Sequence, residues 1–313
     1  MGGYLSRNTK DTGKLKARRF LVRRIFKIWP AFYFLLLVQV IVRRHPIHTF
    51  LFQNLFHLQN YLGTSIAQTW TLAVEEHFYT FLALSFGLLT ARRSGFAGLM
   101  WYCCVASVIA TVLRSISAVH GDFHATLMWT QNRLDSLMFG VILALIYHMR
   151  PNLYRALSRR PIILILIIVA GLMGISALST HPVLFESLGY TLFYLVSGAF
   201  LVLVSEHSQG VRDWKLYRFV SWIGVYSYAL YLWHSAVREP VEHAVERMPE
   251  FLWYPLGLSL QIAGAVVLAV LATRIVEWPF LRWRERIPYL RDDKPLLASR
   301  GQLDMKGTAT ECM

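Results

Sequence analysis

Two adjacent carboxylates and a histidine stand near the start of an apolar run, in the stretch Thr-Trp-Thr-Leu-Ala-Val-Glu-Glu-His-Phe-Tyr at Thr69–Tyr79. Water would hydrate Glu75 and Glu76 at almost no cost, whereas a charge in hydrocarbon costs at least ~2.5–3.5 kcal/mol and requires partners. On a helix, the Tyr79 hydroxyl could reach either carboxylate. A glutamate beside an imidazole can orient its tautomer and raise its basicity, so this stretch is suited to acid–base chemistry.

The composition indicates that this run crosses a membrane. Hydrophobic residues make up 55% of the chain and charged residues only 16%, whereas soluble domains carry about 25% charged residues. The net charge of +14 would suggest nucleic acid if it formed one patch, but in a membrane protein it more often reports orientation. We expect membrane lipids and no nucleic acid as partners. The three cysteines, with Cys103 and Cys104 adjacent, predict core thiols and no metal site.

We therefore predict an all-α fold, a polytopic integral membrane bundle of about eight transmembrane helices. A span needs ~20 predominantly apolar residues. The candidate spans are 28–42, 70–89, 96–113, 134–147, 162–178, 188–204, 219–237 and 252–275. We expect residues 1–27 to form a basic cytoplasmic segment, 28–280 the membrane domain and 281–313 a cytoplasmic tail.

The positions of lysine and arginine predict the orientation of these spans. With the N-terminus inside, most of the 32 basic residues lie on the inner side, and six lie outside. Those six are Arg43, Arg44, Arg114, Arg133, Arg238 and Arg247. This bias predicts a multi-pass inner (plasma) membrane protein with both termini in the cytoplasm.

The topology also brings polar residues of three spans to one depth near the outer side. Glu75 and Glu76 lie ~8–9 Å along their helix, and Asp135, Tyr231 and His234 are expected at a similar level. Charges gathered in this way partly offset each other's desolvation, as a buried reaction or transport site requires. Simpler interpretations stay open, in which Asp135 pairs with Arg133 or caps its helix and the tyrosines are interfacial aromatics.

A basic cluster lies on the predicted inner side, in the run from Arg18 to Pro30. Arg19, Arg23, Arg24 and Lys27 could bind anionic lipid headgroups. They could equally bind an anionic cytoplasmic ligand such as the phosphates of coenzyme A through guanidinium forks. The chain has no glycine-rich phosphate loop, which argues against a nucleotide hydrolase or kinase.

Five motifs in order resemble the acyltransferase 3 family of integral membrane acyltransferases. The resemblance runs from about Arg18 to Arg286. The motifs are Arg23-Arg24-x-x-Lys27-Ile28-x-Pro30, Thr69-Trp70-Thr71-Leu72-Ala73-Val74-Glu75-Glu76-x-Phe78-Tyr79, Arg133-x-Asp135 with Gly140, Gly224-x-x-Ser227-Tyr228-x-Leu230-Tyr231-Leu232-x-His234, and Val276-Glu277-x-Pro279-Phe280.

The resemblance implies transfer of an acyl group, often acetyl from cytoplasmic acetyl-CoA, to a hydroxyl of an envelope or exported carbohydrate. Acyl-CoA would be a co-substrate, with no bound cofactor and no metal. The residues carried over or placed nearby are Glu75, Glu76, Asp135 and His234 as catalytic, Arg19, Arg23, Arg24 and Lys27 on the coenzyme A side, and Trp70, Tyr79, Arg133 and Tyr231 on the acceptor side.

This sequence departs from the family pattern at its start. The resemblance implies ten core helices, and its first helix carries the histidine usually taken as the catalytic base. The opening Met1–Leu5 resembles the close of the second helix, so we expect that a truncation or a late start has removed two helices. His77 or His234 could substitute as the base. The alternatives are an inactive fragment and a transporter or flippase of a lipid-linked or anionic solute, which would use the same buried charges.

Overall fold

The structure is a computed structural model that describes residues 17–43, 47–64, 66–91, 95–207, 210, 213–246, 249–288 and 290. Within these ranges the regular structure is helical and no strand occurs, which confirms the predicted all-α fold. The chain divides into two compact units, 43–225 and the pair of segments 18–42 and 226 onward, and each is described by itself. The predicted N-terminal segment up to residue 16 and the tail from 291 lie outside the described residues.

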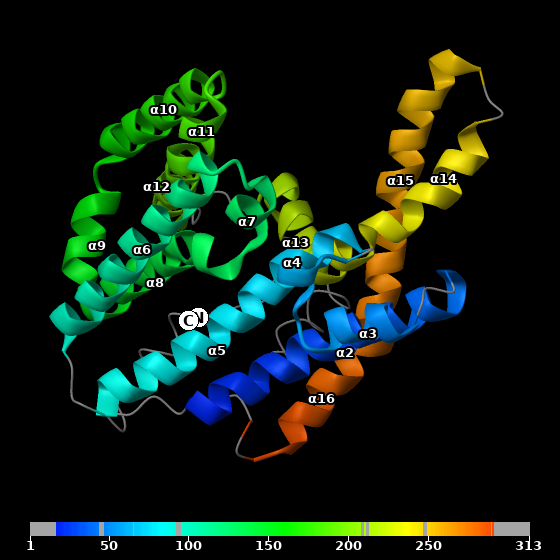
Figure 1. The fold of residues 1–313 in the computed structure, drawn as a ribbon, viewed down its shortest axis with the longest axis horizontal. Coiled ribbons are helices and arrows are strands. Elements are labelled where there is room, and N and C mark those ends of the chain that lie inside the picture. The colour runs from blue at the N-terminus through cyan, green and yellow to red at the C-terminus, as the bar shows by residue number, and fades with distance from the viewer. Residues whose placement is uncertain are drawn as a thin grey trace. The chain divides into compact units, whose positions relative to one another are not determined.

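The first unit contains a succession of membrane-length helices joined by short ones (Figure 1). Proline occupies the start of three of them, α9, α10 and α11, where its missing N–H costs nothing. The elements are α3 (Ile47–Leu55), α4 (Gln59–Leu62), η1 (Ala67–Thr69), α5 (Trp70–Ala91), α6 (Phe96–Val119), α7 (Phe123–Met128), η2 (Thr130–Asn132), α8 (Leu134–Met149), α9 (Pro151–Ser158), α10 (Pro161–Leu178), α11 (Pro182–Leu184), η3 (Phe185–Gly189), α12 (Tyr190–His207) and the first part of α13 (Lys215–Trp233).

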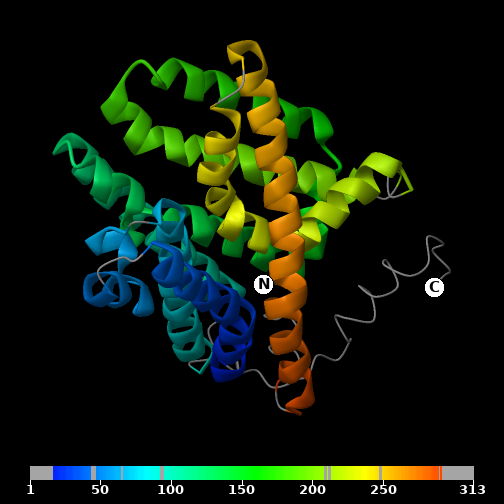
Figure 2. The same ribbon diagram turned by 90° about the vertical axis from the view of Figure 1, so that its right-hand side faces the viewer.

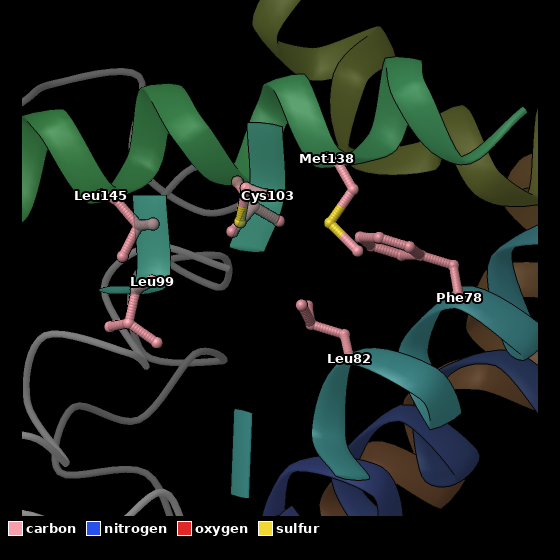
Figure 3. Close-up of a cluster of buried hydrophobic side chains, with 7 residues drawn as sticks. Phe78, Leu82, Leu99, Cys103, Met138 and Leu145 are labelled. Carbon is pink, nitrogen blue, oxygen red and sulfur yellow. The ribbon is translucent and has the colours of Figure 1, made fainter. Parts of the chain in front are cut away.

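A buried apolar cluster joins α5, α6 and α8. Figure 3 shows Met138 of α8 directed at the ring of Phe78 on α5, and Cys103 of α6 belongs to the same cluster. Cys103 is fully buried, as predicted for a core thiol, but its neighbour Cys104 is exposed. Consecutive residues of a helix point ~100° apart, so two adjacent residues rarely share one interface. The third cysteine, Cys312, lies outside the described residues.

Helices α10 and α12 pack closely because glycine removes side-chain bulk at their contact. A methyl group at Gly171 of α10 would overlap the side chain of Val196 on α12. Gly198 of α12 makes similar room for Phe139 of α8. Small residues at such contacts let membrane helices approach, because packing rather than hydrophobic transfer holds them together in lipid.

The second unit is built from most of α2 (Ala17–Arg43), the end of α13, η5 (His234–Val237), α14 (Arg238–Val245), α15 (Glu250–Ala272), η6 (Thr273–Glu277) and α16 (Trp278–Arg286). Figure 2 shows α15, η6 and α16 following one another as a continuous rod. The hydroxyl of Tyr228 on α13 donates to the carbonyl of Ile28 on α2 over 2.7 Å. The rings of Phe34 and Trp233 lie 5.7 Å apart and join the same two helices.

Six helical segments of the described residues are long and apolar enough to cross a membrane, so the chain is a multi-pass helical membrane protein. They are 18–42, 67–89, 96–119, 161–178, 182–205 and 253–286. Of the other two predicted spans, α8 is apolar but has only 16 residues. Helix α13 has 19 residues, but it is not among the six. The predicted number of eight therefore stays a prediction.

Candidate functional site

The two carboxylates of the first unit lie in the second turn of α5. Glu75 accepts a hydrogen bond from the Tyr79 hydroxyl over 3.1 Å, which confirms the predicted contact and selects Glu75 from the two alternatives. Glu76 is 9% exposed and thus buried. Trp70, the first residue of α5, is half-buried. A carboxylate that is partly enclosed beside a phenol can hold or accept a proton in a reaction.

Among the described residues, the side-chain hydrogen bond of the His77 imidazole is to a hydroxyl. Its Nδ1 lies 2.8 Å from Oγ1 of Thr130 at the start of η2. The Nδ2 amide of Asn60 on α4 donates to the same oxygen over 2.9 Å. The ring of Tyr61 stacks on His77 at 5.9 Å. Within the described ranges no hydrogen bond joins this ring to Glu75 or Glu76, because successive helical side chains diverge.

Asp135 pairs with Arg114, which corrects the interpretation that it pairs with Arg133. Nη1 of Arg114 donates to Oδ2 of Asp135 over 2.6 Å, and the two side chains are 0% and 1% exposed. Asp135 lies in the first turn of α8, but its carboxylate binds the guanidinium from α6. Arg133 instead holds its guanidinium over the ring of Tyr190, 4.7 Å from the centroid.

The remaining donors of Arg114 bind backbone and hydroxyl oxygens. Nη1 also donates to the carbonyl of Asn132, and Nη2 to the hydroxyl of Thr191 over 2.8 Å. Nε and Nη2 both donate to the carbonyl of Ser187, over 3.2 and 2.9 Å. Ser187 lies in η3, a π turn. A π turn shifts the backbone hydrogen bonds by one residue and so can offer a carbonyl to another segment. Arg114 thereby ties α6, α8 and α12 together.

The basic residues of the second unit lie along one helix. Arg19, Arg23 and Lys27 follow each other at intervals of four on α2, so they share a face. Nη1 of Arg23 donates to the carbonyl of Leu290 over 2.8 Å. The guanidinium of Arg24 lies 5.6 Å from the ring centroid of Phe20. These contacts fix parts of two guanidinium groups within the protein.

His234 opens η5 at the end of α13 and is exposed. Its Nδ1 lies 2.7 Å from the carbonyl of Tyr231. A carbonyl can only accept, so Nδ1 carries the proton and Nε2 of neutral His234 carries a lone pair. Tyr231 is 37% exposed. Both residues belong to the second unit, so their predicted convergence with Glu75 stays a prediction.

Several contacting residues were absent from the predicted site. Arg114 stands at the end of an apolar run, and the rule that draws attention to Glu75 applies to it equally. The charge pattern alone places it only among the outer basic residues. Asn60, Thr130 and Tyr61 carry no motif of their own, and only the fold brings them to His77.

Comparison with known proteins places this arrangement in a family. Residues 1–270 match the acyltransferase 3 family profile, described as "Acyltransferase domain". The chain belongs to this family. A Staphylococcus aureus (strain COL) protein named "Putative O-acetyltransferase SACOL0978" is 24% identical over 88% of this chain and 50% of its own length. "Peptidoglycan O-acetyltransferase OatA" of Listeria monocytogenes is 25% identical over 89% of this chain and 49% of its own length. The chain thus spans about half the length of these curated relatives. No solved structure matches.

Proposed function

We propose that this acyltransferase 3 chain is a membrane-bound O-acyltransferase that moves an acetyl group from acetyl-CoA to a hydroxyl of a cell-envelope carbohydrate. The observation that carries the proposal is the pair of carboxylates, Glu75 and Glu76, placed inside an apolar helix of an acyltransferase domain. The names of the relatives, O-acetyltransferases and in one case a peptidoglycan O-acetyltransferase, support the acetyl group and the carbohydrate acceptor.

In the proposed reaction the acceptor hydroxyl oxygen attacks the thioester carbonyl carbon. The new C–O bond forms, the C–S bond breaks, and the hydroxyl proton passes through a base to the coenzyme A thiolate. Glu75 or Glu76 would orient that base or stabilise its cationic form. The Asp135 carboxylate is already bound by Arg114. Its proposed role is therefore to hold the start of α8 in place, where the acceptor would bind.

The donor would bind on the side of α2 that carries Arg19, Arg23 and Lys27, with the protein in the inner membrane and both ends of the chain in the cytoplasm. Three cations on one helical face suit the phosphates of coenzyme A. Arg23 also donates to the Leu290 carbonyl, and this contact would keep its guanidinium oriented on that side of α2.

The test uses the full chain in lipid nanodiscs with radiolabelled acetyl-CoA and a peptidoglycan-derived oligosaccharide. Glu76→Gln is expected to lower kcat by up to about 10²–10⁴-fold, the contribution of the base that the carboxylate would orient. The control Glu242→Gln removes an exposed carboxylate of α14 and should retain activity. If wild-type protein labels no acceptor but moves a lipid-linked sugar across vesicles, the transporter alternative replaces this proposal.

A further inference from the structure

The starting point is the hydrogen-bonded relay that ends on His77. Asn60, Thr130 and His77 come from α4, η2 and α5, which contact one another in the first unit. The orientation of the Asn60 amide is set by its second contact, because Nδ2 also lies 3.3 Å from the carbonyl of Met128. A carbonyl accepts only, so the atom that faces it must be the amide nitrogen. Asn60 therefore donates to Thr130.

The Thr130 hydroxyl then has one proton of its own to give. Among the residues that the structure describes, its remaining hydrogen-bond partner is Nδ1 of His77 at 2.8 Å. If His77 instead donated from Nδ1, the Thr130 proton would have no acceptor there, and an unsatisfied buried polar group costs ~1–3 kcal/mol. Thr130 thus donates to Nδ1, which leaves the proton of neutral His77 on Nε2.

This tautomer decides what His77 can do. An imidazole whose Nδ1 accepts a hydrogen bond presents an N–H at Nε2 and has no lone pair there for a substrate proton. Within the described part of the chain, no residue contacts Nε2 by a hydrogen bond, and the side chain is half-buried. In this tautomer, Nε2 of His77 can donate a hydrogen bond but cannot act as a general base. His234, with Nδ1–H fixed on a carbonyl, has the opposite tautomer.

One aromatic ring packs on the His77 imidazole, and a second ring packs on the first. Tyr61 stacks on the His77 ring at 30°, and the Tyr61 and Trp129 rings lie 5.8 Å apart. Tyr61 remains 36% exposed, and its hydroxyl donates to Oε1 of Gln131 over 2.9 Å. Pyranose rings offer C–H faces that pack on aromatic rings and hydroxyl oxygens that accept hydrogen bonds, so this combination of groups suits a sugar.

We infer that Tyr61, Trp129 and His77 form a carbohydrate-binding subsite, in which Nε2–H of His77 donates to an oxygen of the acceptor sugar while Asn60 and Thr130 act as positioning residues. The inference rests on the proposed function for the identity of the sugar as an acceptor. Binding of the sugar and the tautomer of His77 can be measured without any acyl transfer.

The first experiment measures the tautomer by ¹⁵N NMR of the full chain, labelled in its histidine rings and held in lipid nanodiscs. His77→Gln identifies the His77 signals by their loss. We expect a pyridine-like Nδ1 and a pyrrole-like Nε2 for His77, and the reverse for His234 as an internal reference. Thr130→Val should remove the preference at His77. A protonated Nδ1 at His77 in the wild-type chain overturns the inference.

The second experiment measures equilibrium binding of tritiated chitotetraose, with acetyl transfer to it as a separate readout. Glutamine carries an amide N–H near the position of Nε2, so His77→Gln should keep the dissociation constant within about twofold. His77→Phe keeps the ring but loses the donor, and one lost hydrogen bond of about 1 kcal/mol corresponds to weakening by about five- to tenfold. His120→Phe, at an exposed histidine of the same unit, is the matched control.

The outcomes separate this inference from the proposed function. If wild-type protein binds chitotetraose with the expected order of variants but transfers no acetyl group, only the proposed function fails. If His77→Gln impairs transfer as severely as His77→Phe while binding is unchanged, His77 acts on a proton and the donor role is wrong. No binding to folded wild-type protein, with folding checked by size-exclusion chromatography, overturns the sugar subsite.

Discussion

The Arg114 and His77 regions of the first unit both hold a nitrogen-bearing side chain among helices. They differ in how many of its hydrogen-bonding atoms are paired with described residues. Arg114 is fully buried, and its donors reach Asp135, Asn132, Ser187 and Thr191. The structure gives His77 a partner at Nδ1 and leaves Nε2 without a described one. A charged group whose donors all bind protein atoms stabilises the fold. A group that is oriented by a hydrogen bond at one atom can still bind a ligand through another atom.

The largest loss of stability is expected from a substitution in the Arg114 region. Arg114→Met leaves the Asp135 carboxylate buried without its cation, and such a loss costs about 3–5 kcal/mol. Thermal unfolding in detergent, followed by size-exclusion chromatography, measures it. The double variant Arg114→Met/Asp135→Leu removes both charges and should recover much of the loss. Equal damage in the single and double variants would show that the backbone contacts of Arg114, and not its ion pair, hold this region.

A smaller loss of stability should appear near His77 as the pH falls. Burial, with repulsion from nearby His77, lowers the pKa of His57 to about 4 from its ordinary 6.5. Between pH 6.5 and 4 the unfolded chain binds a proton that the folded chain excludes, so stability falls as the pH falls. The full shift corresponds to about 3 kcal/mol, lost by pH 4 and retained above pH 6.5.

The measurement compares apparent melting temperatures of wild type and His57→Asn at pH 7.5 and 4.5. Asparagine suits this position because His57 has a φ of 55°, a left-handed conformation that asparagine tolerates. The variant should be less sensitive to acid than the wild type. The same pH dependence in both proteins would assign the acid sensitivity to other groups.

The smallest effect concerns a contact without charge. Gly171→Leu forces a side chain into Val196 and should cost about 1–3 kcal/mol, as overpacking usually does. Gly140→Ala is the control, since nothing lies within 4 Å of a methyl group there. Melting temperature in detergent again measures the difference. If both variants melt alike, the close approach of α10 and α12 at Gly171 does not contribute to stability.

The sequence predicted the helices well because long apolar runs have few alternatives in a membrane. It also predicted the Tyr79–Glu75 contact, which depends only on spacing along one helix. Of the interpretations left open for Asp135, the one that pairs it with Arg133 is wrong because the pairing depends on contacts between helices. Arg133 is near in sequence, but a helix start separates the two side chains, and the cation came from α6, 21 residues earlier.

The His77 relay could not be found from the sequence. Its members lie 53 and 70 residues apart on separate helices, and asparagine and threonine are too common in connecting segments to indicate a role. The tautomer follows only once the Met128 carbonyl fixes the Asn60 amide. Predictions that need contacts between helices therefore require the fold, whereas those within one helix do not.

The π turn at η3 also sets the rotational phase of α12. Each residue advances an α-helix by ~100°, so one additional residue in a turn rotates everything after it by about that angle. Thr191 faces Arg114 and Val196 faces Gly171 in the phase that follows this turn. Removing one residue between Phe185 and Gly189 would turn both side chains away from their partners without altering a single residue of α12 itself.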